Sequence, residues 1–216
     1  MIPSHALSDS PTALRSGDAL LIVDVQRDFL AGGSLAVPKG EVVLEPLNHL
    51  ISIFNTHGWP IIATRDWHPS QHCSFQSQGG PWPPHCVADS AGAKFADQLA
   101  LPESAYVISK ATTEERDAYS GFSGTRLRAL LERLAVKRLV VGGLATDYCV
   151  LNTVLDAREH GYEVMLATDA IAAVNVSPGD DQRALARMTA AGAMLTSTAN
   201  LKPSSIDLAR ERLQLG

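Results

Sequence analysis

Short apolar runs, each followed closely by polar residues, recur along this chain and restrict the class of fold it can form. Residues 19–23 (ALLIV) are all apolar, and residues 139–141 (LVV) form a second run of this kind. Strands that are buried on both faces have this composition, and they occur in parallel sheets that helices cover on both sides. The sequence therefore predicts a parallel sheet inside a layered α/β protein.

The rest of the chain alternates between strand-like and helix-like segments. Strands are expected at residues 19–23, 60–64, 106–109, 139–141, 163–167 and 193–196. Helices are expected at residues 40–57, 123–135, 179–191 and 204–213, with one more that begins at Thr146. This order predicts a three-layer α/β/α fold with a mostly parallel six-stranded sheet. We expect one domain over residues 1–216, in which residues 1–17 are a loosely held lead-in.

The composition excludes several functional classes. A formal net charge of −5 offers no basic surface for nucleic acid, and no apolar run is long enough to span a membrane. The N-terminus lacks the basic start and apolar block of a secretory signal. Three cysteines are an odd and low count, which favours a reducing, cytoplasmic setting over a disulfide framework. We expect a small-molecule substrate; whether the chain forms a homo-oligomer is left open.

The stretch after the fourth expected strand is typical of a nucleophile-bearing turn. Two glycines end the strand, and Thr146 is expected to cap a helix whose first turn holds Asp147. Cys149 lies in the same turn, where unpaired N–H groups and the positive helix end would favour the thiolate, the nucleophilic form of cysteine. The alternative is that Cys149 is a small buried packing residue.

Reactive side chains follow the ends of four different strands: Asp24, the pair Asp66 and His68, Lys110, and Cys149. In open α/β sheets the chemistry lies outside the carboxyl ends of the strands. Asp24 can serve as general base for the thiol, and Lys110 can stabilise both anions. Alone, Asp24 would be interpreted as a turn residue and Lys110 as a solvated strand end. At one edge they predict a catalytic group with Cys149.

A second group, formed by Asp66, His68, His72 and His85, has the residue types of a metal site. One carboxylate and two or three imidazoles suit Zn²⁺, Fe²⁺ or Mn²⁺, with positions left open for water or substrate. His72 is either a fourth ligand or a residue of the pocket wall. Since four well-spaced Cys or His ligands are absent, a purely structural zinc site is the weaker alternative. Two of the four, His72 and His85, lie within the long loop at 69–92, and loops of this length are usually functional.

Five segments of this chain resemble those of the nicotinamidases, which also act on pyrazinamide and belong to the isochorismatase-like hydrolases. The segments are LLIVDVQRDF (20–29), TRDWHP (64–69), GGPWPPHCV (79–87), SKAT (109–112) and GGLATDYCVLNT (142–153). The resemblance extends over about residues 19–196. It implies hydrolysis of nicotinamide to nicotinate and ammonia through a cysteine thioester, in NAD salvage. Two alternatives remain, a metal-free amidase acting on carbamoyl or ureido compounds and a non-catalytic metal-binding module.

The resemblance also implies a role for individual residues. It implies a triad of Asp24, Lys110 and Cys149; an oxyanion hole from the N–H groups of Ala145 and Cys149; a ring pocket lined by Phe29, Trp82 and Tyr119; and one divalent ion on Asp66, His68 and His85. His72 matches a position that is a ligand in only some members. Zn²⁺ is the first expectation for the ion, and a cis peptide is expected between Leu144 and Ala145.

Overall fold

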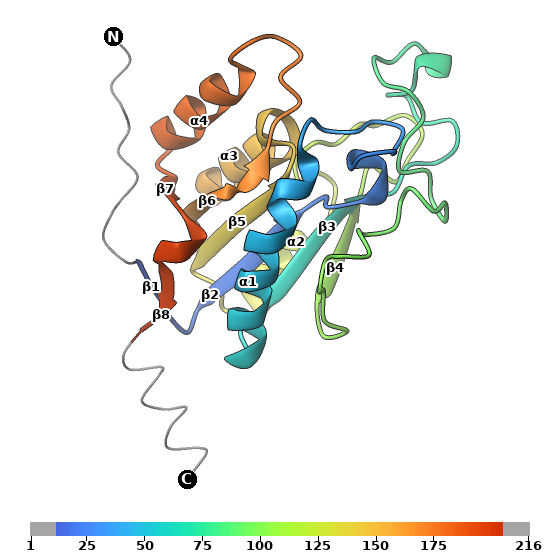
Figure 1. The fold of residues 1–216 in the computed structure, drawn as a ribbon. Helices are drawn as coiled ribbons and strands as arrows, with labels where there is room; N and C mark the ends of the chain where they lie inside the picture. The colour runs from blue at the N-terminus through green and yellow to red at the C-terminus, as the bar shows by residue number, and fades with distance from the viewer. Residues whose placement is uncertain (1–11, 205–216) are drawn as a thin grey trace.

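The structure is a computed structural model that describes residues 12–204 of the chain (Figure 1). Its strands are β1 (Thr12–Leu14), β2 (Asp18–Val23), β3 (Ile61–Asp66), β4 (Tyr106–Lys110), β5 (Arg138–Leu144), β6 (Glu163–Ala172), β7 (Met194–Thr196) and β8 (Leu201–Pro203). Its α-helices are α1 (Leu44–Thr56), α2 (Leu127–Arg133), α3 (Leu151–Glu159) and α4 (Asp180–Ala190). The alternation expected from the sequence is therefore present.

The central sheet has six strands in the order β4-β3-β2-β5-β6-β7, and every neighbouring pair is parallel. Successive residues of β2 point to opposite faces, as the pleat requires. Leu20 and Ile22 pack in a core cluster with Leu47 and Leu50 of α1, while Leu21 packs in a second cluster with apolar residues of α2, α3 and α4. The predicted three-layer α/β/α fold is confirmed.

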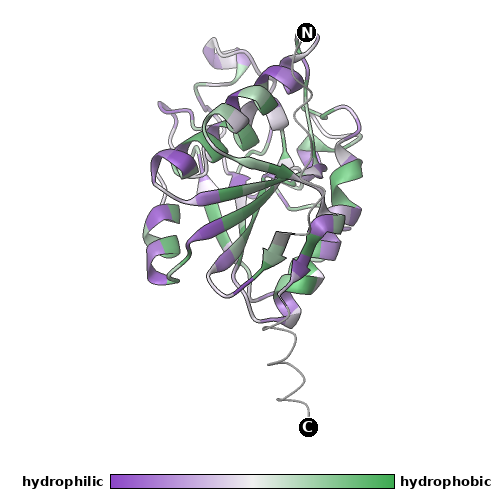
Figure 2. Ribbon diagram, turned by 90° about the vertical axis from the view of Figure 1, so that its left-hand side faces the viewer, coloured by the Kyte–Doolittle hydropathy of each residue, from purple (hydrophilic) through white to green (hydrophobic). Residues whose placement is uncertain are grey.

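Hydropathy follows these layers. Figure 2 shows hydrophobic residues concentrated along the central strands and hydrophilic residues on the outward parts of the helices. Among the helices of residues 12–204, none is long and apolar enough to cross a membrane. The strands need no solvated face because helices lie on both sides of the sheet.

The chain ends are organised differently from the prediction. The prediction that residues 1–17 are loosely held is wrong from residue 12 onward, because β1 pairs in parallel with β8 and Leu14 is fully buried. The Arg138 guanidinium donates a hydrogen bond of 2.7 Å to the backbone of β1 and so ties it to the sheet. Residues 1–11, and the helix expected at 204–213 beyond its first residue, lie outside the described residues.

The helix expected at 123–135 is shorter, and local side-chain chemistry explains the difference. The Thr125 hydroxyl donates to the Gly121 carbonyl and accepts the N–H of Leu127 at 3.1 Å, so α2 starts only at Leu127. At the other end Ala135 has φ of 53°, a left-handed conformation that stops a helix.

The carboxyl ends of the central strands form one edge, and the long segment between β3 and β4 lies beyond it (Figure 1). Asp66 and Lys110 are the last residues of their strands and are paired in register. Asp24 directly follows β2, with φ of 49° where the chain leaves the sheet. Gly143 is needed in β5 because a Cβ there would lie 2.1 Å from the Val23 carbonyl oxygen. This close approach of β5 to β2 places the turn after β5 beside Asp24.

Candidate active site

The turn that carries Cys149 differs in detail from the predicted helix start. Thr146–Val150 forms a π-helical turn that continues into α3, and the capping position is Ala145 without a side-chain cap. The prediction of Thr146 as N-cap is therefore wrong: Thr146 is buried within the turn. The peptide between Leu144 and Ala145 is cis, as expected. Cys149 is 6% exposed and faces the carboxyl edge of the sheet.

Lys110 joins the predicted reactive groups. Its Nζ lies 3.4 Å from the Cys149 sulfur, 3.0 Å from Asp24 Oδ2 and 2.5 Å from Asp66 Oδ1. The ammonium also donates a hydrogen bond of 3.0 Å to the Ala118 carbonyl. One carboxylate oxygen each from Asp24 and Asp66 and the Cys149 sulfur lie within 4.8 Å of one another. Lys110 is 1% exposed, which rules out the solvated strand end considered for it.

Burial dominates the electrostatics of these groups. It raises the pKa of the Cys149 thiol well above its usual value, although the neighbouring Lys110 charge opposes the shift. The helix end was expected to favour the thiolate, but burial shifts the pKa in the opposite direction. Burial also raises the pKa of Asp24, against the opposing charge of Lys110. For Lys110 itself burial disfavours the ammonium, but the carboxylates of Asp24 and Asp66 outweigh it and raise the pKa. The arrangement suits proton transfer from a thiol to a buried carboxylate.

Asp66, His68 and His85 form a compact buried group that could hold a metal ion. Their ligand atoms lie within 4.8 Å of one another. The Nδ1 of His68 lies 2.9 Å from the His85 carbonyl, and the Nδ1 of His85 lies 2.8 Å from the Pro83 carbonyl. Because a carbonyl only accepts hydrogen bonds, both Nδ1 atoms carry a proton, and Nε2 is the nitrogen of each ring that can bind a metal. Burial lowers the pKa of His68 to about 3, so its ring is neutral at pH 7.

This donor set fits a divalent transition metal. One carboxylate and two imidazoles are the three protein ligands of many catalytic zinc sites, in which the fourth position stays open. Hydrogen bonds from the far side of each imidazole to backbone carbonyls are the usual way in which such ligands are oriented. The residues present therefore fit Zn²⁺, and Fe²⁺ or Mn²⁺ accept the same atoms.

His72 is buried beside this group, but both of its ring nitrogens have protein partners. Its ring centroid lies 4.3 Å from that of His68. Nδ1 lies 2.8 Å from the Ser74 hydroxyl and accepts the Ser74 N–H at 3.3 Å, while Nε2 lies 3.2 Å from the Arg116 carbonyl. Its ligand atom groups with those of His68 and the exposed Asp117. In this geometry His72 packs beside the His68 ring.

The three predicted aromatic residues line one cavity with the nucleophile. Phe29, Trp82, Tyr119 and Cys149 all line it, and the Trp82 Nε1–H donates to the Tyr119 hydroxyl at 3.1 Å. The remaining lining residues are Leu35, Val37, Asp66, His85, Ala145, Tyr148 and Val174. The cavity is therefore lined mainly by aromatic and aliphatic side chains, together with Cys149 and two of the metal-ligating residues, Asp66 and His85.

Sequence reasoning missed four of these wall residues, namely Leu35, Val37, Tyr148 and Val174. Tyr148 could have been found from its place beside Cys149 in the turn. The other three lie in irregular segments, where the spacing of residues carries no information about which way a side chain points.

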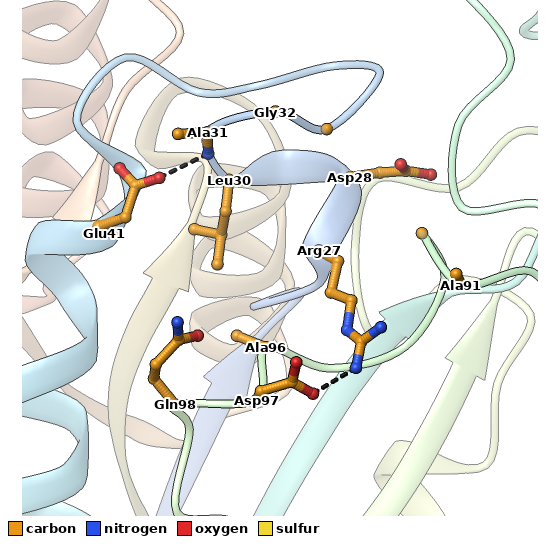
Figure 3. Close-up of a pocket in the computed structure, with 12 residues that line it drawn as sticks. Arg27, Asp28, Leu30, Ala31, Gly32, Glu41, Ala91, Ala96, Asp97 and Gln98 are labelled. Atoms are coloured by element: carbon orange, nitrogen blue, oxygen red, sulfur yellow. Dashed lines mark hydrogen bonds and ion pairs between the residues drawn. The ribbon is translucent and has the colours of Figure 1, made fainter.

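A second hollow of about 430 Å³ is lined in part by residues 27–28 and 30–33, which flank Phe29 in the sequence (Figure 3). Its charged groups are already paired: the Arg27 guanidinium with Asp97, and the Glu41 carboxylate with the Ala31 N–H. Asp28 accepts the N–H of Cys86 at 2.7 Å. None of the predicted site residues lines this hollow, so it is separate from the chemistry of the cavity.

Comparison with known proteins identifies the family of the chain. The isochorismatase domain family matches residues 18–200. The nicotinamidase of Escherichia coli is 41% identical over 203 residues, covering 84% of this chain and 95% of that protein. The pyrazinamidase of Pyrococcus horikoshii, solved in complex with zinc, has a TM-score of 0.80 at 47% identity over 84% of this chain and 99% of its own. PnC1 from L. infantum, solved in complex with nicotinate, has a TM-score of 0.83 at 39% identity over 89% and 99%.

Proposed function

The chain belongs to the isochorismatase family, and within that family we propose that it is a nicotinamidase, which hydrolyses nicotinamide to nicotinate and ammonia. One observation carries the proposal: Cys149 lines the same aromatic cavity as Asp66 and His85, two members of the metal-ligating group. A flat pyridine ring suits aromatic walls, and its carboxamide is the group that a thiol can attack. The name of the L. infantum ligand, nicotinate, agrees with this product.

The reaction begins with Cys149. As its sulfur attacks the carboxamide carbon, Asp24 accepts the thiol proton, and a tetrahedral intermediate forms with its charge on oxygen. The short contacts among Asp24, Lys110 and Cys149 support these roles, and Lys110 keeps the acceptor carboxylate in place. The raised pKa of Asp24 suits it to accept a proton and return it later in the reaction.

The intermediate then collapses. Its C–N bond breaks, the nitrogen takes the proton held by Asp24, and ammonia leaves a thioester on Cys149. Water attacks the thioester carbon while Asp24 accepts its proton, and cleavage of the C–S bond releases nicotinate and restores the thiol. We assign the oxyanion hole to the N–H groups of Ala145 and Cys149, each worth about 2.7–4 kcal/mol in a site of this type.

The metal site belongs to substrate binding in this proposal. Asp66, His68 and His85 would hold the ion, and His72 would orient His68. When bound, the ion supplies a ligand position for the pyridine nitrogen and so orients the ring. Phe29, Trp82 and Tyr119 enclose the same ring, since all three line the cavity.

The same cavity suits pyrazinamide, which differs from nicotinamide by one further ring nitrogen, so we propose activity on both amides. The chain would act in NAD salvage in the cytoplasm, a setting that the three free cysteines, Cys73, Cys86 and Cys149, support.

The decisive test is ammonia release from nicotinamide by the purified protein, with and without a chelator, beside Cys149→Ala and Asp24→Ala. We expect the intact protein to turn over nicotinamide, both variants to lose at least about 10²-fold, and chelation to abolish activity until Zn²⁺ is restored. A protein that releases no ammonia with zinc bound contradicts the function. Near-normal rates in both variants contradict the triad.

A further inference from the structure

Thr64, a residue of β3 that is fully buried, contacts the carboxylate that we assign as general base. Its hydroxyl donates a hydrogen bond of 2.6 Å to Asp24 Oδ1. The backbones of the two residues are also joined, because the Asp24 N–H donates to the Thr64 carbonyl at 3.2 Å. Two hydrogen bonds therefore tie the end of β3 to the residue that follows β2.

The Thr64 side chain has little freedom to turn away from this contact. A Cβ built at Gly121 would lie 2.9 Å from the Thr64 methyl carbon, so the methyl group lies close against a position where only glycine leaves room. A β-branched side chain that is held at its methyl group has its hydroxyl fixed as well. In Thr64 the fixed direction is toward Asp24.

The two oxygens of Asp24 consequently differ. Oδ1 receives the hydroxyl of Thr64, whereas Oδ2 lies 3.0 Å from Lys110 Nζ without receiving a well-aligned hydrogen bond. Oδ2 is therefore the oxygen that has a lone pair available on the side of Lys110, whose ammonium also contacts the Cys149 sulfur. A carboxylate that is free to rotate would lose this distinction.

We propose that Thr64 is a positioning residue that holds the Asp24 carboxylate by Oδ1 and leaves Oδ2 as the atom that accepts the thiol proton. This inference rests on the proposed function and refines it. Thr64 does not line the substrate cavity and is not among the metal-ligating residues, so it acts on the reaction only through Asp24.

The test replaces the hydroxyl and keeps the shape. Thr64→Val should lower kcat about tenfold or more, a part of the 10²–10⁴-fold that a positioned base contributes. Its KM for nicotinamide and its zinc content should stay within about twofold of the parent, because the cavity and the metal group are unchanged. Thr64→Ser, which retains the hydroxyl, should recover kcat to within about threefold.

Two further variants control for packing. Thr196→Val makes the same change at an equally buried threonine outside the site and should leave kcat unchanged. Comparing the kcat of Thr64→Ala with that of Thr64→Ser isolates the effect of the hydroxyl, because the methyl group is absent from both variants. This comparison tests the inference if Thr64→Val does not fold. A Thr64→Val enzyme with kcat within twofold of the parent overturns the inference, as does a Thr64→Ser enzyme as slow as Thr64→Ala. If the parent itself releases no ammonia, the proposed function fails instead.

Discussion

The Lys110 ammonium lies 2.5 Å from Asp66 Oδ1, so the cation beside the nucleophile directly contacts a residue of the metal-ligating group. The two sets of residues that the sequence suggests separately are therefore one buried charge system. It contains the carboxylates of Asp24 and Asp66 and a single ammonium between them. The register pairing of Asp66 with Lys110 on adjacent strands produces the contact.

Removing that ammonium should destabilise the fold. Lys110→Met leaves two buried carboxylates without their cation, a change that typically costs about 3–5 kcal/mol of unfolding free energy. Urea denaturation of the metal-free protein at pH 7 measures the loss. Lys94→Met, at an exposed lysine, is the matched control and should change stability by less than about 0.5 kcal/mol. Equal stability of the two variants would contradict the pairing.

Alkylation should report the protonation state of Cys149. Because burial raises the pKa of its thiol, the thiolate fraction increases only above the ordinary cysteine range. In a Cys73→Ser, Cys86→Ser background, the rate of iodoacetamide modification of the metal-free protein should still be rising beyond about pH 9. The measurement is the rate as a function of pH. A plateau reached below pH 8 would indicate a preformed thiolate and refute this assignment.

Zinc content should separate the two buried histidines. His85→Gln removes the Nε2 atom from the ligand group and should lower the affinity for zinc at least tenfold. His72→Gln removes a ring whose nitrogens are already bonded to the protein, so the protein should still bind about one zinc per chain. Elemental analysis after dialysis against limiting zinc gives the comparison. Equal loss from both variants would make His72 a ligand.

The aromatic wall should control binding more than chemistry. Trp82→Ala opens the cavity on one side and removes the donor to Tyr119. We expect KM for nicotinamide to rise about tenfold or more with a much smaller change in kcat, because the wall contacts substrate and transition state alike. Tyr119→Phe keeps the ring and loses only the hydroxyl, so its KM should rise less. A kcat defect without a KM defect in Trp82→Ala would place the residue in the chemical step.

Much of the site could be predicted from the sequence because parallel strands deliver their following residues to one edge. Asp24 and Lys110 were each unremarkable alone, and only the rule about strand ends brought them to Cys149. The six-stranded sheet followed from the apolar runs, whose composition reflects burial on both faces. The metal-ligating group followed from residue type, since one carboxylate and two or three imidazoles suit a divalent transition metal.

The rest depended on distances that a sequence does not contain. Thr64 belongs to an ordinary strand pattern in the sequence. The hydrogen bond from its hydroxyl to Asp24 arises only because β2 and β3 are neighbours in the sheet. The pairing of β1 with β8 joins segments nearly the whole chain apart. The predicted direction of the Cys149 pKa shift was wrong. The prediction considered the helix end, which lowers the pKa, without the burial of the thiol, which raises it more strongly.

The register of β3 against β4 also makes activity a reporter of correct assembly. A shift of one residue in β4 would turn Lys110 toward the opposite layer and separate it from Asp66 and Asp24 together. Intermediates with native secondary structure but misaligned edge strands would hence be inert. Recovery of amide hydrolysis during refolding would time the final alignment of the sheet, a step that spectroscopic signals of helix content do not detect.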